Sequence, residues 1–120
     1  MLTLKNKKFL IYGCGVSGVS SFNYLKKKNF VKIFDDNIQN IPTNLKPYLI
    51  NYKKINSLIF DYIVISPGIN IKNCLLRKFV NKNKLKIVND FDIFYNLYKK
   101  NTKITITGTN GKSTTSKLIY

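Results

Sequence analysis

Short apolar runs alternate with stretches of helical spacing along the first hundred residues. Four runs rich in β-branched and aromatic residues predict strands, at residues 8–12, 30–34, 62–66 and 85–88. Continuous apolar runs of this length are typical of strands that are buried on both faces of a parallel sheet. Between these strands, and after the last of them, apolar residues recur at helical spacing in residues 17–28, 73–83 and 89–98. The alternation predicts an α/β fold, a Rossmann-like parallel sheet with helices on both faces.

The spacing also selects the apolar residues that define each helix. In residues 73–83, the expected apolar face comprises Leu75, Leu76, Phe79 and Val80. In the last of these helices, Asn89 and Asp90 offer an N-cap, and the i, i+3, i+4, i+7 spacing selects Phe91, Phe94, Tyr95 and Tyr98. Residues 37–58 fit no regular pattern: two prolines indicate turns, and a weak helix or a short strand follows around residues 49–55.

A polar break near Asn101 separates a further pattern from the first hundred residues. Residues 103–107 are β-branched and predict another strand, which runs into Gly108, and a helix is expected to begin near Lys112. We therefore expect a complete domain over residues 1–100, followed over residues 101–120 by the first strand and phosphate loop of a second α/β domain. Without neighbouring strands, the run at 103–107 is expected to be poorly anchored.

Composition limits the available chemistry. The 120 residues carry 21 Lys and Arg against 5 Asp and Glu, a net charge of +16, but 44% are apolar, which suffices for a core. The chain has no His, so histidine acid–base catalysis and zinc sites that need His are excluded. Arg77 is the single arginine, and nucleic-acid readers favour arginine, so the lysine excess indicates coding bias instead. No apolar run approaches the ~18 residues of a membrane-spanning helix.

The first candidate binding motif is a glycine-rich loop at residues 13–18, Gly-Cys-Gly-Val-Ser-Gly. In this G-x-G-x-x-G pattern, the glycines allow a tight turn and let backbone N–H groups approach a diphosphate at the helix N-terminus. Asp35 ends the second strand at the spacing of a ribose-binding acid. The alternative is a glycine-rich turn without a ligand. Asp36 fits a solvated turn, and Cys14 occupies a variable position of the pattern.

A second phosphate-binding pattern covers residues 107–114, Thr-Gly-Thr-Asn-Gly-Lys-Ser-Thr. Gly111, Lys112 and Ser113 match the end of a Walker A motif. In that motif backbone N–H groups cradle the phosphates, the lysine neutralises them and the serine hydroxyl binds Mg²⁺. The chain departs from the strict pattern, which requires glycine where this sequence has Ile106.

A third candidate is the Ser-Pro-Gly-Ile stretch at residues 66–69, which follows the third predicted strand. Ligands of open α/β sheets bind at the carboxyl ends of the strands, where this stretch is expected. A simple Pro-Gly turn explains it equally well.

Two phosphate loops in one short α/β chain resemble the Mur ligases. The likeness rests on residues 13–20 (GCGVSGVS), 66–69 (SPGI) and 107–114 (TGTNGKST). The last motif is specific to Mur and folylpolyglutamate ligases. Residues 89–94 (NDFDIF) resemble the family's Gly-[Glu/Asp]-Ile-Glu-Leu-Phe segment, with Asn and Asp in place of Gly and Glu. The chain lacks the Gly-Gly loop and the His before Gly-Lys of the branch that adds L-alanine, which favours the branch that adds D-glutamate.

The resemblance implies a division of labour between the loops. A UDP-sugar diphosphate would bind the first loop chiefly through backbone groups, with the two aspartates beside the uridine. The residues implied for this substrate are Gly13, Gly15, Val16, Ser17, Gly18, Asp35, Asp36, Ser66 and Gly68. Those implied for ATP are Gly108, Thr109, Asn110, Gly111, Lys112, Ser113 and Thr114, with Lys112 as the catalytic residue and Ser113 as the Mg²⁺ ligand.

The implied activity is ATP-dependent amide-bond formation in cytoplasmic peptidoglycan precursor synthesis, on which cell shape and division depend. ATP phosphorylates the carboxylate of UDP-N-acetylmuramoyl-L-alanine, and the amine of D-glutamate attacks the acyl phosphate. We expect these 120 residues to be a truncated, monomeric, substrate-binding piece without the D-glutamate site, inactive alone, with no nucleic-acid or membrane partner. The alternatives are a small NAD(P)- or nucleotide-binding module without ligase activity, and a basic nucleic-acid-binding protein.

Overall fold

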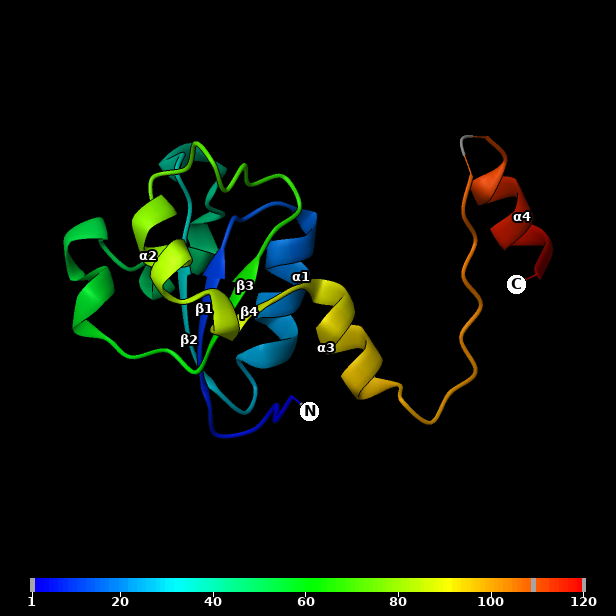
Figure 1. The fold of residues 1–120 in the computed structure, drawn as a ribbon, viewed down its shortest axis with the longest axis horizontal. Helices are drawn as coiled ribbons and strands as arrows, with labels where there is room; N and C mark the ends of the chain where they lie inside the picture. Colours follow the sequence, from blue (N-terminus) through cyan, green and yellow to red (C-terminus); the bar gives the residue numbers. More distant parts are fainter. Residues whose placement is uncertain (1, 109, 120) are drawn as a thin grey trace.

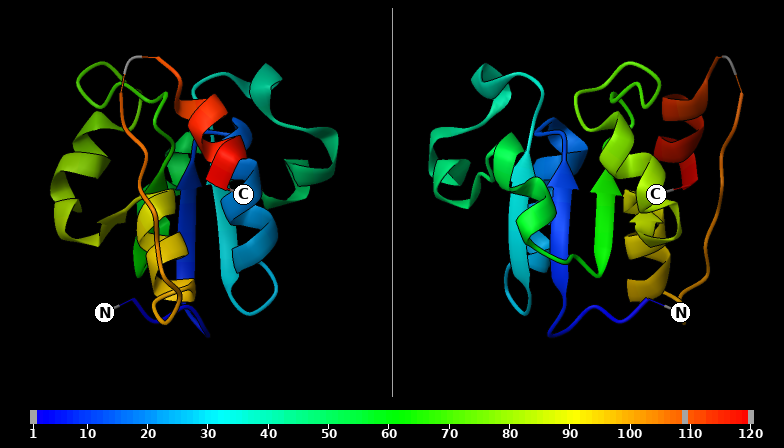
Figure 2. Two further views of the ribbon diagram at one scale, coloured as in Figure 1. Left: turned by 90° about the vertical axis from the view of Figure 1, so that its right-hand side faces the viewer. Right: turned by 60° about the vertical axis from the view of Figure 1, so that its left-hand side comes forward.

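The computed structural model describes residues 2–108 and 110–119. Four parallel strands form one sheet in the order β2-β1-β3-β4. Their bounds are β1 (Lys8–Tyr12), β2 (Phe30–Phe34), β3 (Tyr62–Ile65) and β4 (Ile87–Val88). All pairings are parallel, as the arrows of β1 and β3 in the second view of Figure 2 illustrate, so the loops that follow the strands gather at one edge. The predicted α/β class with a Rossmann-like parallel sheet is confirmed.

Helices cover both faces of the sheet because the side chains of the central strand β1 alternate between two cores (Figure 1). Phe9 and Ile11 pack with Phe22 of α1 (Val16–Leu25) on one face. Leu10 and Tyr12 join residues of α2 (Arg77–Lys82) on the other face. These four side chains of β1 are fully buried, and only Lys8 at the start of the strand is exposed. The strand therefore gives a rigid base to the loop that follows it.

The segment that fits no regular sequence pattern forms three short 3₁₀ helices: η1 (Ile38–Asn40), η2 (Thr43–Tyr48) and η3 (Tyr52–Ser57). Leu45 and Ile55 are buried. The ring of Tyr48 packs edge-on against Phe22, with the ring centres 4.6 Å apart, and Leu49 makes an isolated bridge to β2. The segment is thus anchored to the sheet, and the bridge at Leu49 and the short helix η3 stand where a weak helix or a short strand was expected.

The helix expected over residues 73–83 is shorter in the structure, because α2 begins only at Arg77 and is followed by η4 (Lys84–Lys86). Leu76 and Val80 are buried as predicted, but Leu75 is 58% exposed. The backbone N–H of Leu75 donates to the Asp36 carboxylate at 3.3 Å, which holds it in the turn before the helix. η4 also occupies the start of the strand expected at 85–88, so only β4 remains.

Helix α3 (Asp90–Leu97) begins with the expected cap. The Asn89 side chain accepts a hydrogen bond from the Asp92 N–H, and the Asp92 carboxylate accepts one from the Asn89 N–H, both at 2.8 Å. This reciprocal capping box satisfies two N–H groups that the helix itself cannot bond. The start of the helix is therefore fixed by its own sequence.

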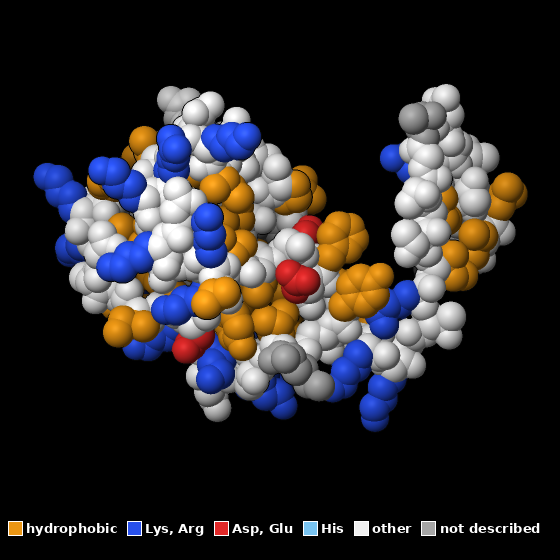
Figure 3. All heavy atoms as spheres, viewed as in Figure 1, with side chains coloured by type: hydrophobic (Ala, Val, Ile, Leu, Met, Phe, Trp, Pro, Cys, Tyr) orange, Lys and Arg blue, Asp and Glu red, His pale blue; other side chains and the backbone are white. Residues whose placement is uncertain are grey.

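The helix predicted by the spacing of residues 89–98 is present, but the residues that follow this spacing are not the buried ones. Ile93 is the buried residue of this helix, whereas the residues chosen by spacing are about half exposed or more: Phe91 (67%), Phe94 (47%), Tyr95 (49%) and Tyr98 (46%). Asp90 and Ile93 lie three residues apart and share a face. That face is turned toward α1, where the Ser17 hydroxyl donates to Asp90. Figure 3 shows hydrophobic side chains left exposed over α3.

Beyond α3 the described chain extends away from the sheet (Figure 1). The strand expected at residues 103–107 is not formed: residues 102–107 belong to no strand, and Ile104 is 66% exposed. A strand requires a partner, and β4 at this edge of the sheet offers only two residues. The helix α4 (Lys112–Ile119) begins where it was expected. Within the described residues, no helix is long and apolar enough to cross a membrane.

Candidate functional site

The loops that follow β1, β2 and β3 enclose a pocket of about 280 Å³ at the carboxyl edge of the sheet. Its lining consists of residues 13–17 of the glycine loop, Asp35 and Asn40 after β2, and residues 66–69 after β3. Open α/β sheets bind ligands at this edge. The structure thus brings together all of the residues predicted for the UDP substrate except Gly18 and Asp36, which are not in the lining.

The three glycines of the loop have different roles. Gly13 has a φ of +101°, and a Cβ there would lie 2.8 Å from the Ser66 Cβ. A Cβ on Gly18 would lie 1.8 Å from the Gly13 carbonyl oxygen, closer than any real contact. A Cβ on Gly15 would meet nothing within 4 Å. Gly13 and Gly18 are therefore required by the fold, whereas Gly15 leaves open space at the pocket for close approach of a ligand to the backbone.

Helix α1 starts at this pocket with an N-terminus that its own sequence does not cap. Gly15 is the N-cap and offers no side-chain hydrogen bond, and the first turn of α1 contains no acidic residue. The first N–H groups of a helix have no acceptor within the helix and carry partial positive charge. The backbone at Val16 and Ser17 can thus donate hydrogen bonds to an anion such as a diphosphate.

The carboxylate of Asp35 is buried and already bonded to protein groups. It accepts hydrogen bonds from the N–H of Cys14 at 2.7 Å, the N–H of Asn37 at 2.9 Å and the side-chain amide of Asn40 at 3.3 Å. Asp35 therefore fastens the glycine loop to the loop after β2, and its predicted contact with a ligand stays a prediction. Sequence reasoning missed Asn40, because no local pattern marks it.

Cys14 offers no reactive thiol at this site. Burial, and then the negative charge of Asp35, raise the pKa of the Cys14 thiol to about 11. The thiol is protonated at neutral pH, and only the thiolate is a good nucleophile. Cys14 and Cys74 are both buried, free cysteines. This agrees with reading Cys14 as a variable position of the loop.

Asp36 points away from the pocket into a separate network. Its carboxylate accepts hydrogen bonds from the Tyr12 hydroxyl and from the Leu75 N–H. The Tyr12 hydroxyl in turn accepts a bond from the Leu76 N–H at 3.3 Å. Burial and the hydrogen bond to Asp36 raise the pKa of Tyr12. The network joins the loop after β2 to the turn before α2, so the structure gives Asp36 a role in holding loops together.

Ser66 ties the third loop to the first. Its hydroxyl donates to the Gly13 carbonyl at 3.0 Å, and its N–H donates to the Tyr12 carbonyl at 2.9 Å. Ser66 is buried, whereas a Cβ on Gly68 would meet nothing within 4 Å. Residues 66–69 thus form one wall of the pocket, with the serine holding that wall in place.

Ser17 connects the pocket to α3. Its hydroxyl donates to the Asp90 carboxylate at 2.7 Å, across 73 residues of sequence. The sequence marked Asp90 only as part of a helix cap, since nothing local shows that α3 packs beside α1.

The described residues of the second loop, 107–108 and 110–114, are all exposed. Gly108 and Gly111 have φ values of +141° and +76°, which glycine adopts without strain. Helix α4 begins at Lys112, so Ser113 and Thr114 lie in its first turn. Asn110, Lys112, Ser113 and Thr114 are all exposed. Thr109 lies outside the described residues. The loop can present N–H groups, a lysine and a hydroxyl to phosphates and Mg²⁺.

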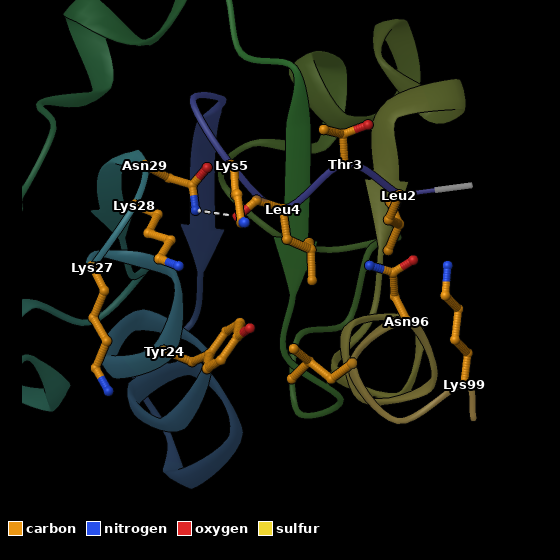
Figure 4. A pocket seen from close by; sticks show the side chains of 11 residues that line it. Leu2, Thr3, Leu4, Lys5, Tyr24, Lys27, Lys28, Asn29, Asn96 and Lys99 are labelled. Carbon is orange, nitrogen blue, oxygen red and sulfur yellow. Dashed lines mark hydrogen bonds between the residues drawn. The ribbon is translucent and has the colours of Figure 1, made fainter. Parts of the chain in front are cut away.

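A larger hollow of about 590 Å³ lies at the other end of the sheet, between the segment before β1 and the ends of α1 and α3 (Figure 4). Its lining includes Lys5, Lys27, Lys28, Lys99, Asn29 and Asn96. Cations near a helix C-terminus offset the helix dipole, which accounts for the lysines at the end of α1. Figure 3 shows lysines spread over the visible face of the molecule. The hollow shares no residue with the glycine-loop pocket, which remains the candidate site.

Comparison with known proteins gives the same family as the motifs. Three relatives are named UDP-N-acetylmuramoylalanine–D-glutamate ligase. The one from Buchnera aphidicola is 35% identical over 94% of this chain, that from Rickettsia prowazekii 34% over 99%, and that from Francisella tularensis 42% over 92%. The chain covers 27%, 27% and 24% of these relatives, so it spans about a quarter of their length. No solved structure gives a significant match.

The family described as "Mur ligase MurD-like, N-terminal domain" matches residues 7–89. This range contains the four strands, the glycine loop and the whole lining of the pocket. By this match over most of its length, the chain belongs to the MurD-like Mur ligases.

Proposed function

We propose that the chain binds the UDP-sugar substrate of an ATP-dependent ligase of peptidoglycan precursor synthesis. The observation that carries the proposal is Gly15, which lies open at the pocket beside the uncapped N-terminus of α1. A diphosphate can approach the backbone closely at such a position. The relatives' names supply the substrates: UDP-N-acetylmuramoylalanine, to which D-glutamate is added.

In this proposal each part of the pocket has one task. The N–H groups of Val16 and Ser17 donate hydrogen bonds to the diphosphate, and the uridine lies between the loop after β2 and residues 66–69. Asp35 and Ser66 hold the loops in their positions through the bonds described above. Residues 1–100 act as the UDP-substrate-binding domain, and residues 101–120 begin the ATP-binding domain.

The second loop would hold ATP with Mg²⁺, which together activate the substrate carboxylate for attack by the amine of D-glutamate. Lys112 neutralises phosphate charge, and the Ser113 hydroxyl is the metal ligand. The positive φ values of Gly108 and Gly111 and the start of α4 at Lys112 support this fit. Because the chain spans about a quarter of its relatives, we propose binding rather than turnover for these residues alone, as a cytoplasmic monomer.

The test is calorimetric titration with UDP-N-acetylmuramoyl-L-alanine, for the unchanged chain and for Gly15→Ala. We expect measurable binding to the unchanged chain. Gly15→Ala should weaken it by at least about tenfold, because the added methyl group occupies the space that the diphosphate needs. The variant should unfold at the same denaturant concentration as the unchanged chain, since the new Cβ meets no neighbour within 4 Å.

The control is Asn81→Ala on the exposed side of α2, which should bind as the unchanged chain does. Absence of heat at millimolar ligand contradicts the proposal. NADH is titrated in parallel: binding of NADH without binding of the UDP-sugar would instead support a NAD(P)-binding module. The bonds that already engage the Asp35 carboxylate argue against that alternative, in which this carboxylate binds a ribose.

A further inference from the structure

Ser17 lies between two hollows. Together with Val16 it lines both the glycine-loop pocket and a groove of about 530 Å³ between α1 and α3. On the groove side, the Ser17 hydroxyl donates a hydrogen bond to the carboxylate of Asp90, the first residue of α3, at 2.7 Å. Asp90 lines the groove but not the pocket. The hydroxyl thus connects the candidate binding site to a helix from a distant part of the sequence.

Asp90 supplies a charge that α1 lacks. The first turn of α1 has no acidic residue and its N-cap is a glycine, so nothing in its own sequence offsets the partial positive charge at its start. The carboxylate of Asp90, bonded to Ser17 in that turn, places a negative charge there. An anionic ligand at the same helix end would take over this role.

A serine hydroxyl has only one proton to donate. If it turns to an oxygen of a diphosphate in the pocket, it can no longer donate to Asp90. A diphosphate bound at the first turn of α1 would also be repelled by the Asp90 carboxylate, because both groups are negative. Binding of the anion and the Ser17–Asp90 hydrogen bond are therefore in competition.

We propose, on the basis of the proposed function, that Asp90 is a positioning residue whose hydrogen bond to Ser17 is broken when the diphosphate binds, which loosens α3. Helix α3 has one buried side chain, Ile93, and the bond to Ser17 holds its first turn to α1. The chain runs from α3 through residues 98–107 into the second phosphate loop. A ligand bound at the first loop thus weakens the attachment of α3 to α1, and α3 is the element from which the chain leads to the second loop.

The test combines calorimetry with amide hydrogen exchange of residues 93–97, using UDP as the probe. In the unchanged chain, saturating UDP should speed exchange of these amides severalfold. Asp90→Asn, whose side-chain oxygen can still accept the Ser17 bond, should bind UDP about three- to tenfold more tightly because the repelling charge is gone. In Ser17→Ala, α3 should exchange fast without UDP and show no further change when UDP is added.

Asp92→Asn is the matched control. It removes the same charge from the same turn of α3, but Asp92 bonds Asn89 and not Ser17. Its affinity for UDP should change by less than about twofold, since the charge does not lie on Ser17. The inference is overturned if UDP binds while exchange of α3 stays constant, or if Asp90→Asn binds no more tightly than Asp92→Asn. If neither UDP nor UDP-N-acetylmuramoyl-L-alanine binds the unchanged chain, the proposed function fails and this inference fails with it. If only UDP-N-acetylmuramoyl-L-alanine binds, the exchange and affinity comparisons are made with that ligand and decide the inference alone.

Discussion

The glycine loop is held by side chains from both neighbouring loops. Asp35 accepts the N–H of Cys14, and the Ser66 hydroxyl donates to the Gly13 carbonyl. The N–H of Gly13 also donates to the Phe34 carbonyl at 2.8 Å. Buried polar groups with good partners restrict a structure to one arrangement. These hydrogen bonds thus fix the shape of the loop and engage the N–H groups of Gly13 and Cys14 within the protein.

Because of Cys14, the stability of the domain is expected to decrease at alkaline pH. Its pKa is raised from 9.0 to about 11, so the folded state keeps the thiol proton after the unfolded chain has lost it. The resulting stability is fully present below pH 9 and is lost as the pH rises to about 11. We expect the free energy of unfolding, relative to that of Cys14→Ala, to fall by about 1–2 kcal/mol between pH 8 and pH 11.

Urea denaturation of the unchanged chain and of Cys14→Ala at each pH measures the difference between their free energies of unfolding. The contributions of all other titrating groups cancel, because both proteins contain them. A difference that is independent of pH would show that the Cys14 environment does not favour the protonated thiol.

At the scale of elements, the turn from β1 into α1 depends on the absence of a side chain at residue 18. We expect Gly18→Ala to destabilise the domain by about 3 kcal/mol, the upper range for overpacking, because its Cβ would lie 1.8 Å from the Gly13 carbonyl oxygen. Gly68→Ala is the paired control, since its Cβ meets nothing within 4 Å. Urea unfolding midpoints measure both. Equal midpoints for the two variants would refute the close contact.

The elements that the sequence predicted well are those fixed by their own residues. The apolar runs of β1 to β3 and the cap at Asn89 needed no knowledge of distant parts of the chain. The failures have a common cause, which is a partner that no local pattern reveals. Leu75 bonds Asp36 in the turn before α2, and α3 packs against α1 through Ile93 and the bond from Ser17 to Asp90. The strand expected at residues 103–107 is not formed, because no strand of the sheet pairs with it.

The same division applies to the candidate site. The glycine loop and residues 66–69 were predicted from their patterns, and the parallel order of the strands brings them to one pocket. The side-chain roles were harder to predict. Asp35 and Asp36 are adjacent in sequence, yet one lines the pocket and the other bonds Tyr12 away from it. Alternate residues at a strand end face opposite sides, which a composition-based argument does not resolve.

At the scale of the whole molecule, a folded body is followed by an exposed segment. None of the described residues from 101 to 119 is buried. We expect brief digestion with trypsin to cleave first after Lys100 or Lys103, leaving a stable product that contains the whole sheet, because proteases attack exposed and unpaired backbone. Mass spectrometry of the early products checks this. First cleavage within residues 8–88 would contradict the prediction.

The two glycine-containing loops, residues 13–18 and 107–114, therefore differ before any ligand binds. The first is locked by contacts from three directions before any ligand arrives, so most of its conformational entropy is lost when the domain folds. The second is exposed on both sides of Lys112, and any ligand it holds must itself order that backbone. A ligand that binds the first loop thus does not have to offset the free-energy cost of ordering its backbone, whereas a ligand of the second loop does. These residues therefore contain one loop that is pre-organised and one whose backbone remains to be ordered.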